Sequence, residues 1–107
     1  MEPLLVLTNV PDAASAEKIA RALIDSRAAA CVNVLAECHS IYRWQGRVET
    51  AAEIPLLIKT TVANYPLVEQ IVRAQHPYDV PELIAIPITH GLPAYLDWLV
   101  TETEQHD

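Results

Sequence analysis

The sequence predicts an α+β fold in which one antiparallel sheet carries helices on one face. Two amphipathic segments with helical spacing, which follow Asp12 and Asn64, each separate short apolar segments that are typical of strands. Between the two helices, residues 29–60 alternate as a long hairpin around Gly46. The resulting order β-α-β-β-α-β, with a closing helix, is a split βαβ arrangement. Residues 1–107 are expected to form a single domain.

The first strand and the first helix follow from local patterns. Residues 3–9 are apolar on both faces, which is typical of a central strand that is covered on both sides. Asp12 follows a turn and is a favourable N-cap for a helix over residues 13–27. Glu17 and Arg21 are four residues apart on its outer face and can form an ion pair. Its core-facing stripe is expected to consist of Ala16, Ile19, Ala20, Leu23 and Ile24.

The long hairpin is the most informative stretch. Ser40, Tyr42 and Trp44 point to one face, Gly46 supplies the tight reversal, and a bend is expected at residues 36–39. Each arm of about 14 residues would extend roughly 45–50 Å. A compact domain of this length has a radius of gyration of only about 13 Å. The hairpin should therefore project, and we expect other copies of the chain to cover it, with Tyr42 and Trp44 as interface anchors.

The second half of the chain supplies the remaining elements. Asn64 can cap the second helix, which ends before Pro77 because proline disfavours helical backbone in the preceding residue. Residues 83–88 form the last strand, and Pro87 places it at a sheet edge. Pro93 begins the closing helix, and the acidic tail after it is expected to fray. The buried stripe of the second helix is Leu67, Val68, Ile71 and Val72.

The composition argues against several classes of function. A net charge of −7 disfavours a nucleic-acid or anionic membrane surface, since both require cationic groups. No run approaches the ~18–20 apolar residues of a membrane span, and the N-terminus lacks the basic segment of a signal peptide. Cys31 and Cys38, in one extended strand, would lie about 23 Å apart, which is too far for a disulfide. Reduced thiols predict a cytoplasmic protein.

The loop over residues 76–82 is the best candidate site. It places the imidazole of His76 near two carboxylates, Asp79 and Glu82, and the phenol of Tyr78 on a backbone stiffened by two prolines. Such a set can hold a divalent ion or act as an acid–base pair. The alternative, which we favour, is a rigid connector in which His76 caps the preceding helix.

Other polar side chains also have a structural interpretation. Cys38 and His39 are a candidate pair of metal ligands, but adjacent strand residues face opposite sides of a sheet. Lys59 can bind an anion, although an ion pair with Glu53 or with a carboxylate of another copy is favoured. No catalytic constellation stands out, and residues 9–12 lack the glycine-rich phosphate cradle that a small phosphohydrolase of this architecture would need.

A set of longer blocks spans nearly the whole chain. The blocks are Ala30-Cys31-Val32-Asn33, Ser40-Ile41-Tyr42-x-Trp44-x-Gly46, Glu53, Lys59-Thr60, His76-Pro77-Tyr78-Asp79-Val80-Pro81-Glu82-Leu83 and Tyr95-x-x-Trp98. In this order and spacing they resemble the CutA family, small trimeric proteins linked by name to divalent-cation tolerance. The resemblance implies a ferredoxin-like protomer with an extended central hairpin, assembled as a PII-like homotrimer.

The resemblance also bears on metal binding. Copper and other divalent cations are reported ligands of the family, and no enzymatic reaction is established for it as a class. Some relatives carry a cysteine in the first strand and a second histidine just before the one that matches His76. Here those positions hold Leu7 and Gln75, so only His76 of that copper-binding set is present.

These observations together predict a cytoplasmic homotrimeric binding or regulatory protein linked to divalent metal (copper) tolerance. Its expected partners are its own copies and a small ligand or metal ion, with neither nucleic acid nor membrane. The alternatives are a dedicated divalent-metal protein that uses His76 with Asp79 and Glu82, or with Cys38, and an uncharacterised small enzyme. The only cofactor considered is a divalent cation such as Cu²⁺. The ligand site is expected in a cleft between subunits, near His76, Asp79 and Glu82 and lined by Tyr42, Trp44, Lys59 and Tyr78.

Overall fold

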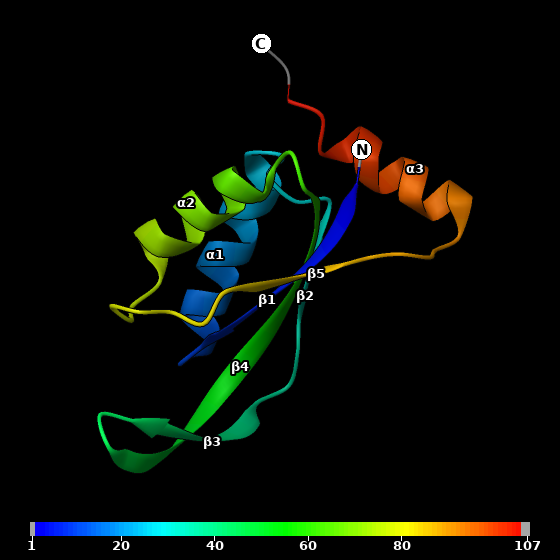
Figure 1. Ribbon diagram of the computed structural model, residues 1–107. Helices are drawn as coiled ribbons and strands as arrows, with labels where there is room; N and C mark the ends of the chain where they lie inside the picture. The colour runs from blue at the N-terminus through cyan, green and yellow to red at the C-terminus, as the bar shows by residue number, and fades with distance from the viewer. Residues whose placement is uncertain (1, 106–107) are drawn as a thin grey trace.

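The computed structural model describes residues 2–105, and this part of the chain contains five strands and three helices (Figure 1). The predicted order is confirmed, except that the outgoing arm of the hairpin is divided into two strands. In sequence order the elements are β1 (Pro3–Val10), α1 (Ala13–Asp25), β2 (Cys31–Val34), β3 (Cys38–Trp44), β4 (Arg47–Thr61), α2 (Tyr65–Gln75), β5 (Ile84–Pro87) and α3 (Pro93–Glu102).

The strands form one antiparallel sheet with the order β2-β4-β1-β5, and β3 pairs with the far end of β4. β1 lies inside the sheet, between β4 and β5, as its apolar sequence predicts. β5 lies at an edge, which suits Pro87 because proline has no N–H to donate to a further strand. β4 joins the two parts of the sheet, since its second half pairs with β1 and β2 and its first half with β3.

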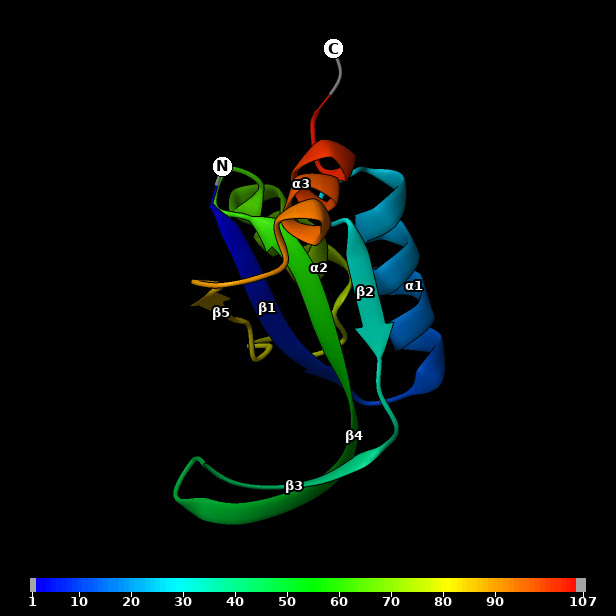
Figure 2. The same cartoon turned by 90° about the vertical axis from the view of Figure 1, so that its right-hand side faces the viewer.

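The helices lie on both faces of the sheet (Figures 1 and 2). α1 and α2 pack side by side on one face, as expected for the two connecting helices. α3 lies across one end of the opposite face. The prediction that the helices lie on one face of the sheet is therefore wrong for α3. None of the helices in residues 2–105 is long and apolar enough to cross a membrane. The main core lies between the sheet and the connecting helices and includes Leu4, Val6, Val10, Ala16, Ile19, Leu23, Leu56, Ile58, Val68 and Val72.

The second face of the sheet is only partly covered. Along β1, buried side chains alternate with half-buried ones. The expectation that β1 is covered on both sides therefore holds for one face only. Because directly paired strand residues point to the same side, the register identifies the side chains of the open face. They are mostly apolar and include Leu5, Leu7, Leu57, Ile84 and Ile86, together with the charged Lys59, which pairs with Leu5.

α1 begins as its sequence predicts and ends earlier. The carboxylate of Asp12 accepts a hydrogen bond from the backbone N–H of Ser15 at 2.7 Å, which is the expected N-cap. The ion pair between Glu17 and Arg21 is also present, at 2.6 Å. Ile24, however, is 42% exposed and does not belong to the buried stripe. Ile24 lies in the last turn of α1. Because the helix ends at Asp25, its apolar stripe does not continue along the sheet beyond this side chain.

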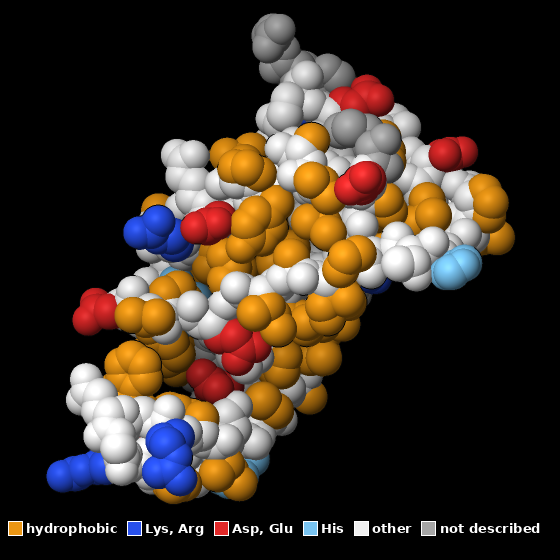
Figure 3. Space-filling model, viewed as in Figure 1, with side chains coloured by type: hydrophobic (Ala, Val, Ile, Leu, Met, Phe, Trp, Pro, Cys, Tyr) orange, Lys and Arg blue, Asp and Glu red, His pale blue; other side chains and the backbone are white. Residues whose placement is uncertain are grey.

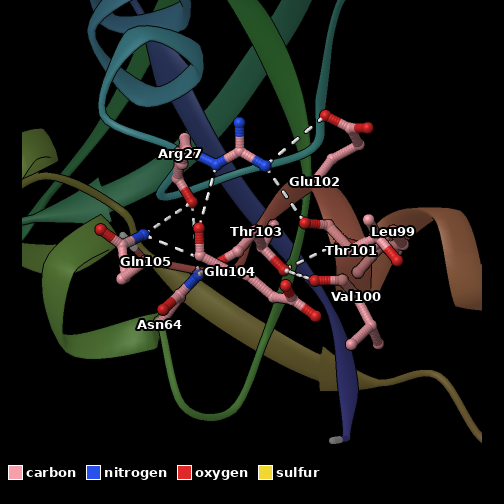
Figure 4. Close-up of polar contacts among 9 residues, drawn as sticks. All are labelled: Arg27, Asn64, Leu99, Val100, Thr101, Glu102, Thr103, Glu104 and Gln105. Carbon is pink, nitrogen blue, oxygen red and sulfur yellow. Dashed lines mark hydrogen bonds and ion pairs between the residues drawn. The ribbon is translucent and has the colours of Figure 1, made fainter. Parts of the chain in front are cut away.

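Asn64 occupies the predicted N-cap of α2, but its side chain makes no capping hydrogen bond. Its amide nitrogen instead donates to the backbone oxygens of Arg27, at 3.3 Å, and Thr103, at 2.5 Å. The guanidinium of Arg27 in turn donates to the backbone oxygen of Glu104 at 2.9 Å. Figure 4 shows this network, which joins the end of α3 to the loops that follow α1 and precede α2. The described part of the acidic tail is therefore bonded to the body, contrary to the expected fraying.

The hairpin has the predicted turn but not a straight shape. Trp44 pairs directly with Arg47, so Gln45 and Gly46 form a two-residue turn. Both have positive φ, 49° and 80°, as a type I′ turn requires. The outgoing arm breaks at residues 35–37, close to the expected bend. The hairpin extends beyond the rest of the sheet and then curves sideways below it (Figure 2), and the molecule measures 44 × 29 × 23 Å.

Candidate functional site

The inner side of the curved hairpin faces the loop between α2 and β5 across a cleft of about 770 Å³. Figure 3 shows this cleft as a hollow at the lower left, with acidic side chains inside it and apolar side chains around it. Small-molecule sites typically have volumes of roughly 300–1,000 Å³ and mostly apolar walls. The principal side chains of the walls are three carboxylates, Glu53, Asp79 and Glu82, and three aromatic rings, Tyr42, Trp44 and Tyr78.

The register of the hairpin brings several of these side chains to one face. Tyr42 and Trp44 share the alternating face of β3. Glu53 joins the same face because it pairs directly with Cys38. The rings of Tyr42 and Trp44 remain 44% and 49% exposed. They are therefore large apolar surfaces, held on one strand and open to a ligand or to another protein.

Glu53 and Tyr78 connect the two walls of the cleft. The hydroxyl of Tyr78 donates a hydrogen bond to Oε2 of Glu53 at 3.2 Å, and Glu53 is only 8% exposed. Burial raises the pKa of the Tyr78 phenol, and the adjacent charge of Glu53 raises this pKa further. The phenol therefore stays protonated at neutral pH and donates to the carboxylate.

Two hydrogen bonds fasten the far end of the loop to β1. The hydroxyl of Thr8 donates to the backbone oxygen of Glu82 at 2.6 Å. The amide nitrogen of Asn9 donates to Oε1 of the same residue at 3.3 Å. These bonds therefore hold the loop wall of the cleft against an interior strand of the sheet.

His76 is a structural residue of this loop. It is the C-cap of α2 and is only 7% exposed. Its Nδ1 accepts a hydrogen bond from the backbone N–H of Tyr78 at 3.1 Å, so the ring proton lies on Nε2. Nε2 donates to the backbone oxygen of Asn9 at 2.7 Å. A metal ion could bind the ring only by displacing one of these backbone groups.

The predicted metal ligands do not gather into one set. Within residues 2–105, no three His, Cys, Asp or Glu side chains form a group that could hold a metal ion. Asp79 and Glu82 line the cleft, whereas His76 is not among the lining residues. Cys38 has its sulfur 3.6 Å from the hydroxyl oxygen of Ser40. Cys31 and Cys38 are free thiols.

Lys59 lies outside the cleft. Its ammonium is 5.8 Å from the ring centre of Tyr95 on α3, where it makes a cation–π contact on the open face. Lys59 and Glu53 are six residues apart on β4, which separates their backbones by about 20 Å. Of the two ion pairs that the sequence favours for Lys59, the one with Glu53 is therefore absent, while the one with a carboxylate of another copy stays a prediction. Lys59 does not join Tyr42, Trp44 and Tyr78 at the cleft.

Glu53 is the wall residue whose place the sequence reasoning missed. Asn9, Ser40 and Val80 also line the cleft without having been predicted there. A signal for Glu53 existed: it is an acidic residue at the start of the apolar half of β4, where a buried charge requires a specific environment. Its direct pairing with Cys38, however, depends on a strand register that a single sequence does not reveal.

Known proteins share this architecture and sequence. Residues 4–102 match the family described as CutA1 divalent ion tolerance protein. A divalent-cation tolerance protein CutA from Thermus thermophilus is 48% identical over 99 residues, covering 92% of this chain and 96% of the relative. A Thermus thermophilus Cut A1 structure superimposes with a TM-score of 0.93 at 47% identity, covering 95% of this chain and 99% of that one. A CutA1 structure from Oryza sativa has a TM-score of 0.94 at 38% identity, covering 99% and 97%. The chain therefore belongs to the CutA1 family of divalent ion tolerance proteins.

Proposed function

We propose that this chain is a cytoplasmic, homotrimeric binding or regulatory protein that contributes to divalent-cation tolerance by taking up a small ligand at the hairpin cleft. The cleft carries the proposal: it has the volume of a small-molecule site, and it combines aromatic and acidic walls. The family's link to divalent-cation tolerance supplies the physiological setting. The free thiols Cys31 and Cys38 suit a reducing compartment.

The partly covered sheet supports the trimer. The open face presents Leu5, Leu7 and Leu57, together with the exposed edge residues Ile84 and Ile86. A contiguous apolar face of this kind marks an interaction surface in a soluble protein. The strand order β2-β4-β1-β5 supports a ferredoxin-like protomer, and a PII-like arrangement would bring three such faces together. Other copies of the chain are the proposed occupants of this face.

The curved hairpin places the cleft beside such a neighbour. Ile41 and Val48 alternate with the cleft-facing residues of the hairpin and are 66% and 63% exposed, and Ile41 also borders the cleft. A neighbouring copy that covers them would fix the curvature of the hairpin and border the cleft, so that the ligand site lies between subunits. Binding rather than catalysis is proposed, and the hydrogen bonds of both His76 nitrogens argue against copper chelation at that ring.

Native mass spectrometry tests the assembly and the site together. The expected particle contains three chains of 11.9 kDa, about 36 kDa in all, and retains small molecules that are released on denaturation. The variant Tyr42→Ala, which removes one wall of the cleft, should lose the retained mass. A particle of 11.9 kDa at working concentration would contradict the trimer, and equal retention by Tyr42→Ala would contradict the cleft.

A further inference from the structure

We propose that the cleft accepts an organic cation, specifically an aliphatic amine with two or more ammonium groups. The inference rests on the proposed function, because it names the chemical class of the ligand for that same site. It follows from the charges that line the cleft, from the environment of Glu53 and from the arrangement of the aromatic rings.

The cleft has a uniform charge. Its ionisable walls are the carboxylates of Glu53, Asp79 and Glu82 and the phenols of Tyr42 and Tyr78, and its lining includes no Lys, Arg or His side chain. Three carboxylates on low-dielectric walls concentrate negative potential inside the cleft, which attracts cations and repels anions.

Glu53 is a buried carboxylate that has no positive partner among residues 2–105. It is 8% exposed, and its hydrogen bond comes from the neutral hydroxyl of Tyr78. The ion pairs found in residues 2–105 join Arg21 to Glu17 and Arg27 to Glu102, and neither includes Glu53. Buried carboxylates are usually paired, because burial without a counter-charge is costly. A ligand ammonium group would supply the missing charge.

The nearest basic residue on the same face of the hairpin does not fill this role. Arg47 lies opposite Trp44 at the tip. It is six residues from Glu53 along β4, which corresponds to about 20 Å. Glu49 lies between them, opposite Tyr42, and adds a further negative charge to that face. The hairpin itself therefore offers Glu53 no cation.

The aromatic rings favour an organic cation over a metal ion. Tyr42 and Trp44 project from one strand as neighbours on the same face, and Tyr78 lies across the cleft. The faces of such rings attract ammonium groups and pack against methylene groups, whereas a divalent metal ion needs several oxygen, nitrogen or sulfur ligands at short distance. No such ligand group occurs in the described residues.

The positions of the carboxylates favour more than one ammonium group. Glu53 belongs to β4 and contributes from the hairpin wall, whereas Asp79 and Glu82 contribute from the loop wall. A single ammonium group that pairs with Glu53 leaves the loop carboxylates without a counter-charge. An aliphatic chain with an ammonium group at each end can satisfy both walls while its methylene groups lie against Tyr42 and Trp44.

Three five-carbon probes of different charge test the inference by isothermal titration calorimetry at constant ionic strength. Cadaverine carries two ammonium groups, pentanediol is neutral, and glutarate is a dianion. Cadaverine should bind the assembled wild-type protein at least about tenfold more tightly than pentanediol, and glutarate should not bind. Glu53→Gln, which keeps the size and a hydrogen-bond acceptor but removes the charge, should weaken cadaverine binding about tenfold or more.

Matched variants keep the test decisive. Glu104→Gln removes the same charge just after α3, the helix at the opposite end of the molecule from the hairpin, and should leave cadaverine binding unchanged. If Glu53→Gln fails to fold by circular dichroism, Asp79→Asn on the loop wall replaces it and should weaken cadaverine binding severalfold.

Several outcomes would overturn the inference. Equal or tighter binding of pentanediol or glutarate would show that the cleft takes a ligand of another class, so the proposed function would stand without the cation. Absence of cadaverine binding, or equal binding to wild type and Glu53→Gln, would also refute it, while the native mass still decides the trimer independently. If the Glu53→Gln assembly dissociates and the wild-type protein does not bind cadaverine, the positive partner of Glu53 is instead a basic side chain of a neighbouring copy.

Discussion

Replacing His76 with alanine is expected to destabilise the fold while leaving any Cu²⁺ binding unchanged. The substitution removes the bond from Nε2 to the Asn9 oxygen at 2.7 Å and the bond from the Tyr78 amide to Nδ1 at 3.1 Å. Each backbone group left buried without a partner costs about 1–3 kcal/mol. Because both bonds are only part-buried, water can offset some of this loss, and the free energy of unfolding should fall by about 2–4 kcal/mol.

Urea unfolding followed by circular dichroism measures this loss, and calorimetric titration with Cu²⁺ measures the binding. His90→Ala is the matched control: His90 is exposed, and its ring contacts the hydroxyl of Thr89 at 3.0 Å. This control should change the free energy of unfolding by less than about 0.5 kcal/mol. If His76→Ala unfolds like wild type and abolishes Cu²⁺ binding, the structural role assigned to this ring is refuted.

Three further predictions concern assembly, pH and packing. On dilution, the Trp44→Ala assembly should dissociate at a higher protein concentration than the Trp98→Ala assembly, as measured by native mass spectrometry. Dissociation of both variants at the same concentration would argue against Trp44 as an interface anchor. Because the pKa of Tyr78 is raised on folding, its contribution to stability is complete below about pH 10 and is lost as the pH rises further. Tyr78→Phe should therefore reduce the alkaline loss of stability in urea titrations, and an unaltered pH profile would contradict this. Leu56→Ala, at a fully buried position, should lower the free energy of unfolding by about 2–5 kcal/mol in the same assay. Leu92→Ala, at a position that is 71% exposed, should lower it by less than about 0.5 kcal/mol. Similar losses in both variants would contradict the assigned core.

Local chemistry is what made the elements predictable. The Asp12 carboxylate caps α1 through a bond to a residue three positions away. Gly46 adopts the positive φ that the hairpin turn demands, and Pro87 lies on the edge strand that its missing N–H requires. In each case the determining contact or restriction lies within a few residues, so the sequence pattern carries the information.

The failures arise where distant segments meet. Asn64 has the residue type of an N-cap, but its amide bonds to Arg27 and Thr103, which are 37 and 39 residues away. The carbonyl groups of these two distant residues thus take the Asn64 side chain away from the helix N-terminus. The helical periodicity of the sequence does not predict such a contact. Ile24 likewise continues the apolar stripe of α1 in sequence, yet the helix ends at Asp25 and this side chain stays exposed.

The candidate site shows the same division. The sequence predicts Tyr42, Trp44 and Tyr78 at a cleft between subunits; within the single chain they line a common cleft, and its position between subunits stays a prediction. Lys59 was expected with them but lies about 20 Å along β4 from Glu53. The role of Glu53 depends on its pairing with Cys38 and on the curvature of the hairpin. Both are tertiary properties, since the register and the bend place the carboxylate opposite the loop.

A crystal structure of the assembly grown with cadaverine would test the central claim most directly. We expect three copies of the chain to cover one another's open sheet faces, and the diamine to lie in the hairpin cleft with one ammonium group bonded to the Glu53 carboxylate. A monomer with a free hairpin and an empty cleft, or a cleft filled by a basic side chain from a neighbouring copy, would contradict the account.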